Sequence, residues 1–194
     1  MPRTSENPPG VPAQLSSFGL EDAPPTVTLP VPMPAADELQ VLTTLDEVRK
    51  ATNDVAASGQ RLISIFTPDM EPALYEQPAF LEIIKRLVLG RSFAKVRVLV
   101  RDHSRTSAAT NRFIAMARRL TSYLEIRPLA AQFRDITAAY CIADDRAIVY
   151  RLRADRWEGI VALNSPPVAR QYLAEFDNCW LASGEQSQAR AARR

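Results

Sequence analysis

The sequence has little histidine and cysteine and no long apolar run. It contains one histidine and two cysteines among 194 residues, so a site built from several histidine or cysteine ligands is excluded. Cys141 and Cys179 lie in apolar segments and are expected to be buried free thiols. No run approaches the ~20 apolar residues of a membrane-spanning helix, and the N-terminus lacks the pattern of a signal peptide. We therefore expect a cytoplasmic protein without a metal, a cofactor or a transmembrane segment.

Proline is scarce beyond the first 35 residues, which hold nine of the fifteen prolines. This opening stretch has little apolar periodicity and cannot bury enough surface to offset the entropy lost on ordering. We interpret residues 1–40 as a disordered arm. The arm carries one basic and five acidic side chains, whereas the rest of the chain carries 23 basic and 17 acidic ones. Such an acidic arm either covers the basic domain as an electrostatic lid or only keeps the protein in solution.

Lysine is also rare, and arginine supplies 21 of the 24 basic residues. Arginine suits phosphate recognition because its planar guanidinium donates two parallel hydrogen bonds. Gathered on one face, the arginines would form a phosphate-binding surface. The alternative is a set of solvated faces balanced by nearby acids. The candidate ligand-binding residues are Arg112, Arg119, Arg134, Arg151 and Arg153.

Hydrophobic periodicity predicts one α/β domain over residues 41–184, followed by a basic flexible tail over residues 185–194. Helices are predicted from Thr44 or Asp46 to Gly59, from Pro78 to Gly90, over 107–120 and after Pro166. Strands are predicted at 62–66, 96–100, 124–126, 138–143, 147–150 and 159–163. This order of helices and strands, with a hairpin near the end, predicts a single αβα sandwich with a mixed β-sheet.

The order of elements and several short motifs resemble a half-domain of the phospholipase D-like superfamily. The resemblance covers about residues 43–182 and includes a strand ending in Phe66-Thr67-Pro68. Near the C-terminus it includes Glu158-Gly159-Ile160-Val161 and Phe176-Asp-Asn-Cys-Trp180. The chain is also similar to an uncharacterised bacterial domain that sometimes follows acetyltransferase domains. The resemblance implies a phosphodiesterase fold whose active half-site reads His-x-Lys-x-x-x-x-Asp.

At that spacing this chain has Thr137, Ala139 and Asp144, so the nucleophilic histidine and the phosphate-binding lysine are both replaced. A threonine hydroxyl has a very high pKa, and no base is evident beside it. Loss of a nucleophile commonly lowers the rate by about 10⁶-fold. The sequence therefore predicts a catalytically degenerate domain, a pseudoenzyme that binds nucleic acid or another phosphate-bearing ligand such as a phospholipid headgroup.

Two other hypotheses stay open at this point. A hydrolase with relocated chemistry would use His103, although the residue seven positions later is Thr110 and not an acid. A structural homodimer or partner-docking protein would use the former active-site face as an interface, because active single-half relatives pair across that face. Asp144 and Asp145 favour a hairpin turn over a catalytic carboxylate pair, because adjacent residues point in different directions.

Overall fold

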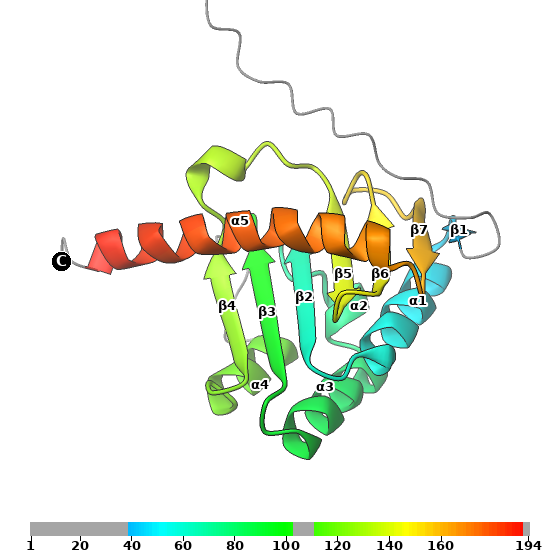
Figure 1. Cartoon of the computed structure of the whole chain (residues 1–194), viewed down its shortest axis with the longest axis horizontal. Coiled ribbons are helices and arrows are strands. Elements are labelled where there is room, and N and C mark those ends of the chain that lie inside the picture. Colours follow the sequence, from blue (N-terminus) through cyan, green and yellow to red (C-terminus); the bar gives the residue numbers. More distant parts are fainter. Residues whose placement is uncertain (1–38, 103–110, 192–194) are drawn as a thin grey trace, which may run out of the picture. The chain divides into compact units, whose positions relative to one another are not determined.

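The computed structural model describes residues 39–102 and 111–191, with side chains described as far as Glu185. Within these ranges, seven strands form one mixed sheet with helices on both faces (Figure 1). The predicted αβα sandwich is therefore confirmed. The strands are β1 (Leu39–Leu42), β2 (Leu62–Thr67), β3 (Lys95–Val100), β4 (Leu124–Pro128), β5 (Ala139–Ala143), β6 (Ala147–Arg151) and β7 (Gly159–Ala162). The predicted arm lies outside the described residues except for Leu39 and Gln40, which belong to β1.

The strand order β1-β7-β6-β5-β2-β3-β4 brings the two halves of the domain together at the centre of the sheet. Strands β2, β3 and β4 are parallel, and the other neighbouring pairs are antiparallel. Tyr140 of β5 pairs with Phe66 of β2, and Ala139 pairs with Arg151 of β6. The end of β2, the start of β5 and the end of β6 therefore meet at one end of the sheet.

Each face of the sheet is covered by a different set of helices. The helices are α1 (Leu45–Ser58), α2 (Pro72–Tyr75), α3 (Pro78–Gly90), α4 (Arg112–Arg119), η2 (Ala131–Phe133) and α5 (Pro166–Ala191). Alternate residues of the hairpin take opposite faces: Cys141 and Val149 share a core with residues of α1, α3 and α4, whereas Ile142 and Ile148 share one with α5. Burial on both faces explains why the central strands are almost continuously apolar.

Several helix starts follow the expected capping chemistry. Thr44 Oγ1 accepts a hydrogen bond from the N–H of Glu47, whose carboxylate accepts one from the N–H of Thr44, which completes a capping box. Asn111 caps α4 in the same sense by accepting from the N–H of Ile114. Helix α3 begins at Pro78, where a missing N–H is not needed.

Helix α5 anchors its face of the sheet through aromatic residues. The rings of Phe176 and Trp180 stack at a centroid distance of 5.7 Å. The Arg127 guanidinium of β4 lies 3.9 Å from the centre of the Trp180 ring. The helix continues to Ala191, into the segment 185–194 that the sequence predicts to be flexible. No helix in the described part of the chain is both long and apolar enough to cross a bilayer.

Candidate functional site

The residues at the motif positions of the phospholipase D-like resemblance lie at opposite ends of β5. Thr137 precedes the strand and Ala139 begins it, whereas Asp144 follows its end, about 23 Å from Thr137 along an extended chain. Thr137 is exposed, and its Oγ1 donates to the carbonyl of Leu152 at 3.3 Å. We call the end of the sheet around Thr137 and Ala139 the remnant site. Asp144 is not part of it.

Asp144 instead links the turn between β5 and β6 to the segment that leads into β2. Its Oδ1 accepts hydrogen bonds from the N–H groups of Arg61 and Leu62 at 2.8 and 2.9 Å, and its Oδ2 accepts one from Gln60 at 3.0 Å. Its φ of 53° is left-handed, a conformation that aspartate tolerates better than most residues. Asp144 therefore has a structural role at the β5–β6 turn, where it holds the start of β2.

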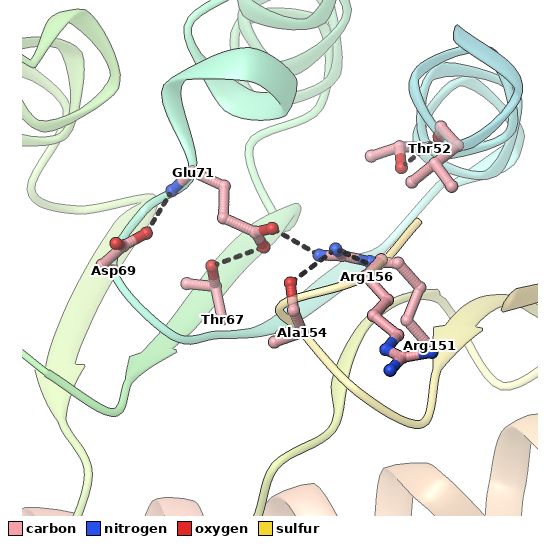
Figure 2. Close-up of polar contacts among 8 residues, drawn as sticks. Thr52, Thr67, Asp69, Glu71, Arg151, Ala154 and Arg156 are labelled. Atoms are coloured by element: carbon pink, nitrogen blue, oxygen red, sulfur yellow. Dashed lines mark hydrogen bonds and ion pairs between the residues drawn. The ribbon is translucent and has the colours of Figure 1, made fainter. Parts of the chain in front are cut away.

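The remnant site contains a buried ion pair between Glu71 and Arg151. Nη2 of Arg151 lies 2.5 Å from Oε1 of Glu71, and their side chains are only 3% and 8% exposed. Thr67 at the end of β2 donates its hydroxyl to Oε2 of Glu71 at 3.1 Å (Figure 2). The N–H of Glu71 donates to the carboxylate of Asp69 at 3.3 Å. Two elements that are 80 residues apart in sequence are thus joined at this end of the sheet.

Arg151 also organises the loop that follows β6. Its Nη1 donates to the carbonyls of Ala154 and Arg156, both at 3.0 Å (Figure 2). Its guanidinium lies 5.0 Å from the centre of the Trp157 ring. Within the described residues, the guanidinium therefore has protein partners for two of its nitrogens and an aromatic ring beside it. An incoming phosphate would have to displace these partners to reach Arg151.

Little space remains at Ala139, the position at which the resemblance would place a lysine. Ala139 lies beside Arg151 in the sheet, on the face that α1 and α2 cover. Both residues line a cavity of about 10 Å³, together with Thr52 and Tyr75. This is about the space of one water molecule. Among the described residues, the space beside Ala139 is therefore too small for a phosphodiester.

Burial sets the protonation chemistry of this pair. Burial raises the pKa of the Glu71 carboxyl, although the charge and hydrogen bond of Arg151 oppose the change. Burial also raises the pKa of the neighbouring Tyr75 hydroxyl well above its ordinary value. The desolvation of Glu71 thus outweighs its attraction to Arg151, as is common for buried ion pairs.

The backbone that presents Glu71 is unusual. Met70, which precedes it, is fully buried and has a φ of 70°, the left-handed region that a bulky side chain rarely adopts. Such a residue costs about 1–3 kcal/mol and persists only where its surroundings fix it. Here the buried Met70 side chain and the Glu71–Arg151 pair hold the turn after β2.

The arginines that the sequence proposes as a single binding surface are spread over three places. Arg112 and Arg119 line a groove of about 370 Å³ between α3 and α4, together with Lys85. Arg134 is exposed after η2. Arg151 is buried as described, and Arg153 pairs with Asp155 at 2.7 Å. Arg112 and Arg119 therefore share one groove, which the other three candidates do not line.

The remaining expectations from the sequence concern the histidine, the two cysteines and metal binding. His103, the candidate nucleophile of a relocated hydrolase, lies outside the described residues. Cys141 and Cys179 are buried and not disulfide-bonded, as predicted. Burial raises their pKa to about 12 and about 11, so neither is a reactive thiolate at neutral pH. Among the described residues, no cluster of histidine, cysteine and carboxylates resembles a metal site.

Sequence reasoning missed Glu71, Thr67 and Lys85. In the sequence, Glu71 before Pro72 has the pattern of a helix-start residue, and it does precede α2. The available signal was that Thr67 and Glu71 follow a buried strand, where polar side chains of α/β proteins gather. Their link to Arg151 depends on the pairing of β2 with β5 and of β5 with β6, which no local pattern reveals.

The family follows from the sequence itself. The profile of the family described as "Domain of unknown function (DUF7931)" matches residues 44–192. The chain belongs to the DUF7931 family. No curated protein matches it in sequence.

The fold of this DUF7931 protein is similar to two solved structures. TrmBL2, an archaeal chromatin protein whose structure shows a novel mode of DNA binding, matches with a TM-score of 0.56 and 16% identity. The match covers 77% of this chain and 52% of TrmBL2, so the chain spans about half of that protein. NucT from Helicobacter pylori matches with a TM-score of 0.50 and 13% identity, over 74% of this chain and 96% of NucT. At these identities the likeness concerns the fold alone.

Proposed function

We propose that this protein is a phospholipase D-like domain that lacks the family's hydrolytic chemistry and binds nucleic acid at the α3–α4 groove. The observation that carries the proposal is the set of cations in that groove. Lys85, Arg112 and Arg119 are exposed there, and no acid is among the described residues that line it. None of the three forms an ion pair within the described residues. Such cations are free to contact phosphates.

The fold supports a role of this kind. TrmBL2 is a chromatin protein whose structure shows a novel mode of DNA binding. A fold shared with such proteins does not by itself assign a ligand. The basic groove on this chain is the separate feature that favours a polyanion.

The remnant site supports the absence of hydrolysis. Its nucleophile position holds Thr137, whose hydroxyl faces a backbone carbonyl. Its lysine position holds Ala139, and the adjacent cation, Arg151, is neutralised by Glu71. Neither of these two positions therefore supplies the imidazole or the lysine that the resemblance requires for hydrolysis.

The proposal is tested by nucleic-acid binding over a salt series. We expect Arg112→Ala/Arg119→Ala to weaken binding by at least about tenfold and to lower the slope of log K against log salt concentration by about 1.5. Arg86→Ala/Arg118→Ala is the matched control, because it removes two exposed arginines of the same helices that do not line the groove. Equal losses in both variants would contradict a specific role for the groove, and absence of binding by the wild type would contradict the function.

A phosphodiesterase assay with a generic diester tests the catalytic half of the proposal. We expect no turnover above background by the wild type or by His103→Ala. Turnover by the wild type that His103→Ala abolishes would instead support the hydrolase with relocated chemistry.

A further inference from the structure

The α3–α4 groove combines a charged rim with an apolar floor. The floor is formed by Leu81, Met116 and Leu120. Leu81 and Met116 are 6% and 8% exposed, whereas Leu89 at the side of the groove is 69% exposed. The groove therefore presents apolar side chains as well as cations, so it suits a ligand that has both charged groups and apolar faces.

The rim sets the spacing of the charges that the ligand must carry. Arg112 and Arg119 are seven residues apart on α4, which is about 10 Å along the helix axis. Lys85 faces them from α3. A ligand that satisfies all these side chains has several negative charges along its length and apolar surface between them.

Resting on the proposed function, we propose that the groove selects single-stranded over double-stranded nucleic acid by binding unstacked bases on its apolar floor. In a duplex the base faces are stacked inside the helix, so only sugars and phosphates would reach the groove. A single strand presents base faces as well as phosphates. The rim then binds the backbone of the strand, and Leu81, Leu89, Met116 and Leu120 contact the bases.

The test compares three labelled probes by fluorescence anisotropy with the full chain. The probes are an oligothymidine of about 15 nucleotides, an abasic strand of the same length, and a duplex of the same length. We expect the oligothymidine to bind at least about fivefold more tightly than the abasic strand. We also expect Leu89→Ser to weaken oligothymidine binding several-fold and to leave abasic binding unchanged. Leu181→Ser is the matched control, because Leu181 is 65% exposed on α5 and does not line the groove.

A variant that is expected to bind more tightly completes the test, because a gain of affinity cannot result from misfolding. Ala115 is exposed in the groove, so Ala115→Trp adds a ring on which a base can stack. We expect tighter oligothymidine binding by about fivefold or more and no change for the abasic strand. Tighter binding of both strands to the same extent would contradict base contact.

The outcomes separate this inference from the function on which it rests. Equal affinity for the three probes, with loss in Arg112→Ala/Arg119→Ala, would overturn strand selection and leave polyanion binding standing. No binding of any probe would overturn both. Displacement of oligothymidine by polyglutamate at equal charge concentration would also overturn the inference, because an acidic protein segment would then satisfy the groove equally well.

Discussion

At the scale of single residues, the pairing of Glu71 with Arg151 decides what the remnant site can do. Both partners are buried, but their surroundings differ. Arg151 also donates to two backbone carbonyls and lies beside Trp157, whereas Glu71 has one further hydrogen bond to its carboxylate, from Thr67. The cation is therefore well solvated by protein groups and the anion is not. The raised pKa of Glu71 expresses the same asymmetry.

This asymmetry predicts unequal effects of removing the two partners. Arg151→Met leaves a buried carboxylate without its cation and should lower the free energy of unfolding by about 3–5 kcal/mol. Glu71→Gln keeps an acceptor for Arg151 and should change it by less than about 1 kcal/mol. Adding Glu71→Gln to Arg151→Met should restore most of the loss. Urea unfolding monitored by tryptophan fluorescence measures all four proteins, and equal losses in the two single variants would contradict the argument.

The same prediction has a defined pH dependence. The folded state raises the pKa of Glu71 above its ordinary value of 4.5, so the folded state binds this proton more tightly than the unfolded state does. The contribution of Glu71 to stability is then complete below the ordinary pKa and is lost as the pH rises through the raised one. Arg151→Met removes the cation that opposes this shift. Its destabilisation should therefore shrink between about pH 7 and about pH 5, and growth over that range would contradict the assignment.

At the scale of secondary structure, local patterns predict most elements of the domain. Thr44 and Gly59 limit α1 as expected, and the apolar runs at 62–66 and 96–100 are the central strands. Local patterns do not predict strand β1 and helix α2. Each has only four residues, which is too short to show a repeating pattern of apolar residues. Strand β1 is stabilised by its pairing with β7, a contact between segments that are distant in sequence.

The turn between β5 and β6 gives a prediction at this scale. Asp144→Ala removes three backbone hydrogen bonds and places alanine at a φ of 53°, so it should destabilise the fold by about 2–3 kcal/mol. Asp145→Ala removes an exposed ion pair with Arg170 and should cost less than about 1 kcal/mol. Asp144→Asn keeps one acceptor and should fall between them. Thermal unfolding measures the three variants, and equal effects of the two alanine substitutions would contradict the structural role of Asp144.

At the scale of the whole molecule, the fold is predictable from the order of its elements, whereas the sites are not. The sequence alone predicts that Thr137 and Ala139 replace a histidine and a lysine, because the motif spacing is local. It does not show that Glu71 neutralises Arg151, because the two meet only after β2 pairs with β5. Likewise, Arg112 and Arg119 share a helix face in the sequence, but Lys85 joins them only when α3 and α4 lie together. Contacts between segments that are distant in sequence, and not residue types alone, therefore define both the Glu71–Arg151 pair and the α3–α4 groove.

The distribution of charge over the chain predicts how its N-terminal part acts on binding. Residues 1–38 carry one basic and five acidic side chains, so their deletion raises the net charge from +2 to +6 while β1 keeps its first residue, Leu39. A more positive protein attracts a polyanion more strongly at long range. We expect the deletion to tighten oligonucleotide binding several-fold at about 50 mM salt and to have little effect at about 200 mM, where screening is stronger.

A charge variant of the full chain separates this effect from steric blocking. Replacing the five acids by their amides leaves the length of the chain unchanged, and electrostatics alone predicts that this variant binds as tightly as the deletion. If only the deletion tightens binding, the segment acts by occupying space and not by its charge. If the deletion weakens binding, residues 1–38 contribute to the ligand contact, and the basic domain is not sufficient for it. Association rates across the two salt concentrations distinguish these cases, because long-range attraction acts mainly on the rate of encounter.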